Sequence, residues 1–278
     1  IIFTPSGKGP YVVPFGRVDK AETPGTIINK NIYRGTSETT FEGKHLMTYF
    51  TDSEENAKHY TGEKGKVDKY NFKADKADMK VIDMGGNSWD MFNDEIFYFD
   101  EETGKWELDE SLPNNKELKK AITGVYKDLD KIDPDYSKNP PEVAKLLQEI
   151  ADGINQDPYN SMRSLKIDEK SVEHFRPLLE YLKLPVNEYA LLYTGYLVDF
   201  NETERFSTET VLLKYKLTYP NIKGVIFENI QDPDLGNHYV LFPEGMGKES
   251  LQNRSNLNKR LVNKDVWETT NLKYFKKK

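Results

Sequence analysis

The sequence predicts an α+β fold in which a β-rich unit, built from both ends of the chain, is interrupted by a mainly helical insertion. Short runs of β-branched and aromatic residues fill the first third of the 278 residues and return near residue 224. Between them, apolar residues recur at three- and four-residue spacing, which is typical of amphipathic helices. We therefore place the β-rich core at residues 1–85 and 209–257, the helical insertion at 86–208 and a basic tail at 258–278.

The first third contains the expected strands of the amino-terminal part of this core. Candidate strands are residues 11–13, 27–28, 32–33, 66–72 and 79–84, with a polar turn between the second and the third. One short helix interrupts them. Ser53, with Asp52 before it, supplies an N-cap, Glu54 and Glu55 complement the helix dipole, and the helix reaches Tyr60.

The middle of the chain predicts four helices. Leu118, Ile122, Val125, Leu129 and Ile132 form one apolar stripe, and a second helix is expected to follow Pro140-Pro141. Ser171 is expected to cap a third helix in which Pro177 lies in the first turns or produces a kink. A fourth, apolar segment at 189–198 is expected to be capped by Asn187.

Strand character returns near the end of the chain. Candidate strands are residues 210–215, 224–227 and 238–242, and the turn-rich segment 231–237 should join the last two as a hairpin. These strands would complete the β-rich core.

Composition excludes several classes of protein. The chain has no Cys, which removes disulfide scaffolds, thiolate metal sites and cysteine nucleophiles. The four His residues show no metal-ligand spacing, and neither a Gly-Lys-Ser/Thr phosphate loop nor a Gly-x-Ser-x-Gly elbow occurs. A hydrolase with a serine or metal nucleophile is therefore disfavoured.

Charge is distributed unevenly along the chain. The net charge is −7, yet nine basic and three acidic residues lie between Lys248 and Lys278. An acidic body argues against a broad nucleic-acid surface, and the basic end is expected to be a solvated tail or to attract an acidic partner. No apolar run is long enough for a membrane span and no secretory signal is seen, so we expect a cytoplasmic monomer. The sequence begins with Ile1 rather than Met, which suggests either a trimmed chain or a piece of a longer polypeptide.

Two segments suggest a ligand site. In residues 32–37, Gly35 follows a strand and would expose its backbone to a ligand, for which the carboxamide of nicotinamide is suited. Residues 48–60 run from a strand into a helix, so the rings of Tyr49 and Tyr60 could face each other and sandwich a flat ring. Arg34 could hold a ribose hydroxyl or a phosphate. The alternative is that both tyrosines are core aromatics and Arg34 is a surface residue.

These segments resemble the NAD-binding motifs of the ADP-ribosyltransferase superfamily. Tyr49-Phe50-Thr51-Asp52 and Tyr60 resemble the poly(ADP-ribose) polymerase and diphtheria-toxin branch, and Arg34-Gly35-Thr36 resembles its first motif with Arg in place of His. The segments 224–230 and 238–243 are similar to the final strands of phage and bacterial members. The motifs cover the first 85 residues and about 220–257, and the insertion resembles nothing that we can name.

The resemblance implies a split β-sheet core and a toxin-like effector of phage or bacterial type. It also implies transfer of ADP-ribose from NAD, a substrate, to a macromolecular acceptor, expected to be a host protein, without a metal. The residues that it assigns to NAD binding are Arg34, Gly35, Thr36, Tyr49, Phe50, Tyr60 and His238.

The catalytic acid is the position at which this chain departs from the family pattern. His238 stands where the polymerase branch has Glu, in Asn237-His238-Tyr239. A carboxylate there would stabilise the oxocarbenium charge that develops when the nicotinamide–ribose bond breaks. Asp232, which we favour, and Glu228 are the candidate substitutes, and Arg34 is a further catalytic candidate.

Three functional hypotheses follow. The first is an NAD-dependent ADP-ribosyltransferase whose helical insertion presents the acceptor. The second is a weak or inactive relative that acts as a binding or inhibitor module. The third is a structural segment of a larger phage polypeptide.

Overall fold

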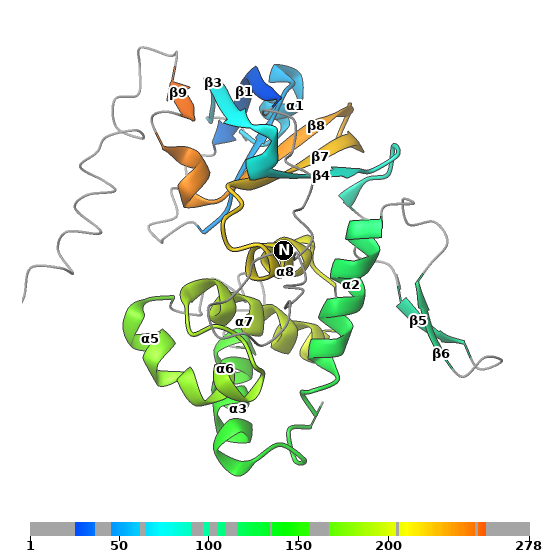
Figure 1. Ribbon diagram of the computed structural model, residues 1–278, viewed down its shortest axis with the longest axis vertical. Coiled ribbons are helices and arrows are strands. Elements are labelled where there is room, and N and C mark those ends of the chain that lie inside the picture. Colours follow the sequence, from blue (N-terminus) through cyan, green and yellow to red (C-terminus); the bar gives the residue numbers. More distant parts are fainter. Residues whose placement is uncertain are drawn as a thin grey trace, which may run out of the picture.

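The computed structural model describes residues 26–36, 46–61, 65–89, 97–100, 105–108, 116–133, 135–155, 167–203, 206–247 and 250–253. The strand expected at residues 11–13 and the basic tail at 258–278 lie outside these residues. Within them, the chain forms a β-sheet and a layer of helices below it (Figure 1).

The sheet contains strands from both ends of the described chain, as the sequence predicts. Its order is β4-β7-β8-β2-β1-β3-β9, and β4 and β7 are parallel whereas the other neighbouring strands are antiparallel. The strands are β1 (Ile27–Thr36), β2 (Thr48–Thr51), β3 (Lys66–Asp75), β4 (Met79–Asp83), β7 (Gly224–Gln231), β8 (Leu235–Leu241) and β9 (Leu251–Asn253). This mixed architecture confirms the predicted α+β class.

Helices and short elements complete the fold. The helices are α1 (Glu54–His59), α2 (Lys116–Leu129), α3 (Pro141–Asn155), α5 (Glu169–His174), α6 (Arg176–Tyr181), α7 (Glu188–Thr203) and α8 (Thr208–Thr218). Two 3₁₀ turns are η1 (Lys76–Asp78) and η3 (Pro243–Met246), and a separate hairpin consists of β5 (Phe97–Asp100) and β6 (Lys105–Leu108). Within the described residues no helix is both long and apolar enough to cross a bilayer.

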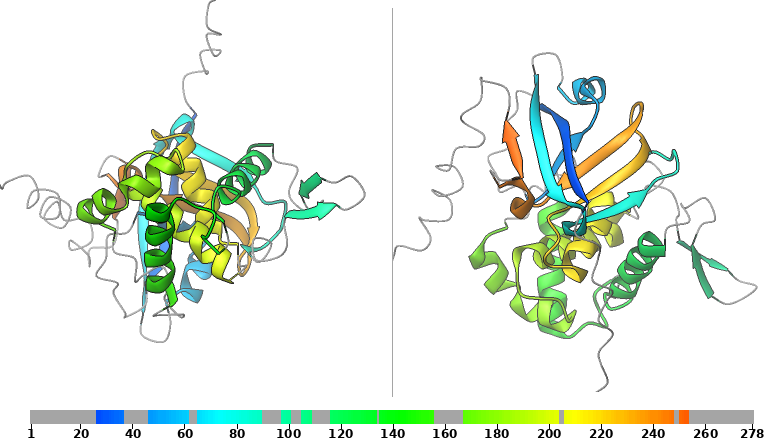
Figure 2. Two further views of the ribbon diagram at one scale, coloured as in Figure 1. Left: turned by 90° about the horizontal axis from the view of Figure 1, so that it is seen from below. Right: turned by 45° about the horizontal axis from the view of Figure 1, so that its top comes forward.

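Two apolar clusters lie on the two faces of the sheet. The larger joins one face, through side chains such as Val225, Phe227 and Val240, to the helices α2, α3, α7 and α8. The smaller includes Ile32 and Tyr239 and lies where the β1–β3 part of the sheet turns across the β7–β8 part (Figure 2). The larger cluster is therefore shared by the helical layer and one face of the sheet.

Several local predictions are confirmed. Ser53 caps α1, since its Oγ accepts a hydrogen bond of 3.2 Å from Asn56 N. Asn187 caps α7 in the same way, accepting from Ala190 N at 2.9 Å. α2, α3 and the β7–β8 hairpin also lie where their patterns place them.

Three predictions are wrong. Residues 210–215 are not a strand: they belong to helix α8, which is capped by Ser207 and buried on several sides, so its apolar run shows no helical period. Residues 27–28 and 32–33 are not separated by a turn, because both belong to β1, which pairs with β3 along its whole length. The cap of the third helix is Asp168 rather than Ser171, and the chain bends at Phe175 between α5 and α6.

Candidate functional site

The strand order places the predicted motifs side by side. β2 lies between β1 and β8, with Tyr33 opposite Thr51 and Thr51 opposite His238. The chain leaves β2 at Asp52 and enters α1 at once, so Tyr60, the C-cap of α1, lies near the tip of the β7–β8 hairpin. Three segments that are far apart in the sequence therefore meet at one end of the sheet.

The Asp232 carboxylate lies where these segments meet. The Tyr60 hydroxyl and the Trp89 indole N–H both donate hydrogen bonds to Asp232 Oδ2. His238 Nε2 lies 3.2 Å from the backbone carbonyl oxygen of Asp232, and His238 Nδ1 lies 3.9 Å from Oδ2. We call these four residues, Tyr60, Trp89, Asp232 and His238, the Asp232 cluster.

The local environment sets the protonation states in this cluster. Burial, and then the Asp232 carboxylate, raises the pKa of Tyr60, so its hydroxyl remains a donor at neutral pH. Burial lowers the pKa of His238 although the charge of Asp232 opposes that shift, which favours a neutral ring. The Asp232 side chain is 21% exposed and Tyr60 is 46% exposed, so both remain open to solvent on one side.

A second set of bonds fixes the hairpin against α1. Asp52 Oδ1 accepts from Asn237 N at 3.0 Å, and Asp52 Oδ2 accepts from Asn237 Nδ2 at 2.8 Å. Asn56 Nδ2 donates to the carbonyl oxygen of Asp234 at 2.9 Å. Asp52, a residue of the Tyr-Phe-x-Asp motif, therefore positions the loop that holds Asp232.

The two tyrosines do not face each other as the sequence suggests. The Tyr49 side chain extends from β2 toward the helical layer, where its hydroxyl donates to Glu209 Oε1 on α8 at 2.9 Å. Trp89 contacts the surroundings of both: its ring meets Tyr49 edge-on at a centroid distance of 6.4 Å, and its indole N–H donates to the same Asp232 oxygen as the Tyr60 hydroxyl.

Gly35 has a packing role between β1 and α1. A Cβ at this position would lie 2.1 Å from the carbonyl oxygen of Ala57 and 3.0 Å from Tyr60 Cβ. The direction that a side chain at this position would take is therefore covered by α1. Gly35 allows the helix to approach β1 closely.

Arg34 lies away from the Asp232 cluster. It is directly opposite Asp68 on β3, and the neighbouring Ile32 is opposite Tyr70, so Arg34 shares the sheet face of the smaller apolar cluster. Burial lowers the pKa of Arg34, while the charges of Tyr70 and Asp68 act against this shift. Tyr49 belongs to the opposite face.

The remaining predicted residues also lie on or near the sheet face that carries the smaller apolar cluster. Phe50 is buried in the smaller cluster, where its ring contacts Tyr70 at 5.4 Å. Thr36 follows Arg34 by two residues, and its hydroxyl donates to the carbonyl oxygen of Lys66 at 3.3 Å. Glu228 follows Phe227 on β7, and successive strand residues point to opposite faces, so Glu228 shares the face of Ile226, a residue of the smaller cluster.

Trp89 is the one member of the Asp232 cluster that sequence reasoning missed. It falls in the predicted insertion, three residues after Gly86, and its indole also packs edge-on against Phe227 at 4.8 Å and His238 at 5.6 Å. An isolated Trp beside a glycine turn was the one signal in the sequence. In the part of the chain that the structure describes, no group of His, Asp and Glu residues is arranged to hold a metal ion.

Comparison of the chain with protein-family models, with curated proteins and with solved structures finds no match in any of the three.

Proposed function

We propose that the protein transfers ADP-ribose from NAD to a macromolecular acceptor and releases nicotinamide. The observation that supports this proposal best is the meeting of Tyr60, Asp232 and His238 at one partly open end of the sheet. The proposal also rests on the resemblance of the motifs around these residues. The same geometry favours Asp232 over Glu228 as the catalytic acid.

Each residue of the Asp232 cluster has a role in this proposal. The exposed Tyr60 ring offers a surface on which nicotinamide can stack. When the bond between nicotinamide and ribose C1′ breaks, the bonding electrons leave with nicotinamide and positive charge develops on the ribose. Asp232 stabilises that charge and accepts the proton that the acceptor nucleophile loses as it bonds to C1′. The neutral His238 holds the backbone of Asp232 in place.

Trp89 must move for nicotinamide to reach both tyrosines. Its indole meets the Tyr49 ring edge-on and donates to Asp232 Oδ2, so displacement of Trp89 would also remove one of the two hydrogen bonds that this oxygen accepts. Binding of NAD should therefore change the Trp fluorescence of the protein, and Trp89→Phe should remove that change.

Transfer can be measured with NAD labelled separately on the nicotinamide ring and on the adenylate. The full chain is incubated with labelled NAD and a bacterial lysate, and free nicotinamide and macromolecule-bound label are followed. Asp232→Asn should slow nicotinamide release by roughly 10²-fold or more. Tyr189→Phe is a matched control, because Tyr189 also donates to a carboxylate, Glu244 at 3.2 Å, but in the helical layer. Absence of release by the folded wild type would overturn the transferase proposal.

Binding is measured in parallel by equilibrium dialysis. Tyr60→Ala should abolish NAD binding with little loss of thermal stability, because the ring is 46% exposed. A large fall in melting temperature would instead indicate that Tyr60 is a core aromatic.

A binding module without chemistry is the second candidate. It is favoured by one observation: Asp232 is already bonded to both Tyr60 and Trp89, while His238 stands in the position of the acid. Under this alternative the wild type binds NAD or a host protein but releases no nicotinamide. Asp232→Ala and Glu228→Ala would then leave its function intact.

A further inference from the structure

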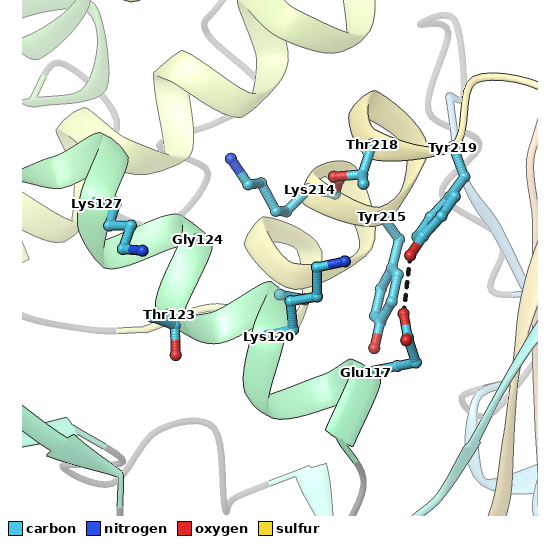
Figure 3. Close-up of a pocket in the computed structure, with 10 residues that line it drawn as sticks. Glu117, Lys120, Thr123, Gly124, Lys127, Lys214, Tyr215, Thr218 and Tyr219 are labelled. Carbon is cyan, nitrogen blue, oxygen red and sulfur yellow. Dashed lines mark hydrogen bonds between the residues drawn. The ribbon is translucent and has the colours of Figure 1, made fainter. Parts of the chain in front are cut away.

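A cavity of about 330 Å³ lies between α2 and α8, outside the Asp232 cluster (Figure 3). This volume is at the lower end of the range of small-molecule sites, roughly 300–1,000 Å³. Gly124 leaves room for the aliphatic part of the Lys214 side chain to pack against α2, since a Cβ on Gly124 would lie 2.8 Å from Lys214 Cε. The lining residues that matter here are Glu117, Lys120, Lys127, Lys214, Tyr215 and Tyr219.

The lining has an excess of positive charge in a chain whose net charge is −7. Lys120 and Lys127 are exposed and form no ion pair within the described part of the chain. Lys214 bonds to Asp128 at 2.5 Å, but Asp128 also receives Lys131 at 2.6 Å, so one carboxylate faces two ammonium groups. Glu117, the acidic residue of the lining, accepts a hydrogen bond from Tyr219 at 2.8 Å.

A buried hydroxyl provides a second, independent observation. Tyr215 is 2% exposed, and its hydroxyl has no hydrogen-bond partner among the described residues. Its oxygen is directed toward the first turn of α2, where Glu117 and the Tyr219 ring border the same end of the cavity (Figure 3). Buried polar atoms without a partner are rare and costly, and a bound ligand is one way to satisfy them.

We propose that this cavity binds a small organic phosphate. Lys120, Lys127 and Lys214 surround the phosphate, and the Tyr215 hydroxyl bonds to the organic part. Lysine ammonium groups act as separate point charges that can surround a tetrahedral phosphate dianion. A planar carboxylate is better matched by the two parallel N–H donors of an arginine guanidinium, and the lining contains no Arg. This site is separate from the proposed NAD site and does not depend on transferase activity.

Calorimetric titration tests the proposal with inorganic phosphate, ribose 5-phosphate, AMP and succinate as probes. The wild type should bind at least one of the two phosphate esters saturably, and more tightly than succinate. Lys120→Gln/Lys127→Gln should weaken that binding by about tenfold or more, because two charges that contact the phosphate are lost. The matched double variant Lys138→Gln/Lys145→Gln changes the net charge equally at exposed lysines outside the cavity and should retain wild-type affinity.

Two further variants locate the ligand. Tyr215→Phe should weaken ester binding by about threefold or more, the value of one hydrogen bond, and should leave thermal stability unchanged because no protein partner is lost. Asp232→Asn should leave ester binding unchanged, which separates this cavity from the proposed NAD site. The proposal is overturned if no phosphate ester binds at millimolar concentration, if succinate binds as tightly, or if the two double variants lose affinity equally. A large loss of stability in Tyr215→Phe would also contradict it.

Discussion

Replacement of Gly35 by Ala separates the structural role of this residue from the predicted ligand-binding role. The new methyl carbon would lie 2.1 Å from the Ala57 carbonyl oxygen and 3.2 Å from the Ala57 carbonyl carbon. These are backbone atoms of α1, so no side-chain rotation relieves the clash. The helix would have to move back by roughly 1 Å, which also moves Tyr60. Overpacking of this kind costs about 1–3 kcal/mol, and each kcal/mol lowers the melting temperature of a chain of this size by about 2–4 °C.

Thermal unfolding with a matched glycine variant provides the assay. Gly247→Ala is the control, because Gly247 has φ −60° and no described atom lies within 4 Å of the position that the new methyl group would take. Its stability should be unchanged or slightly higher, since Ala restricts the unfolded chain more than Gly does. If Gly35→Ala has the same melting temperature as the wild type, α1 does not pack against β1 as closely as the structure shows. If it also loses NAD binding, the predicted contact between Gly35 and nicotinamide is the better explanation.

Three further predictions concern buried polar groups. Burial raises the pKa of Asp128, but the hydrogen bonds that Asp128 accepts, among them the one from Lys214, lower this pKa overall. The ionised Asp128 therefore stabilises the fold at pH values above its unfolded pKa, and this stabilisation is lost as the pH falls through the lower folded pKa. Asp128→Asn should therefore lower the free energy of unfolding by about 1–3 kcal/mol at pH 7. In urea unfolding, the stability of this variant should also depend less on pH below pH 4 than that of the wild type. The pKa of His238 is lowered by burial, so stability should fall as pH drops below about 6.5, and His238→Gln should remove that dependence between pH 7 and 5. Tyr49→Phe removes a hydrogen bond to Glu209 and should cost about 1–2 kcal/mol in chemical unfolding; an unchanged stability with lost nicotinamide release would instead support a direct role for Tyr49 in NAD binding.

Local signals account for the elements that the sequence located correctly. α1 has a Ser cap followed by two Glu residues, and α2 and α3 each bury one regular stripe against the rest of the helical layer. α8 lacks such a stripe because neighbours bury it on several sides, and its Val and Leu run is then indistinguishable from a buried strand. The burial that hid α8 is a property of the assembled core, not of the segment.

Trp89 could not be assigned to the site for a related reason. It follows a glycine turn after β4, and apart from the isolated Trp beside that turn nothing in the nearby sequence indicates a ligand. The contact that matters is with Asp232, which lies 143 residues later in the chain. That contact depends on the parallel pairing of β4 with β7, which no local pattern specifies. The same pairing brings the segment after β4, where the insertion is expected to begin, next to the candidate site.

The position of Arg34, in contrast, follows from a rule that the sequence already contains. Successive residues of a strand point to opposite faces, so Arg34 lies on the face of Ile32, and Tyr33 and Gly35 lie on the other. A motif taken as a continuous string assigns Arg34 and Gly35 to one ligand, although in this strand they belong to opposite faces. NAD bound at the Asp232 cluster would reach Arg34 only around the edge of the sheet. Arg34→Ala should therefore change nicotinamide release less than Asp232→Asn does, and equal losses would place Arg34 in the same site.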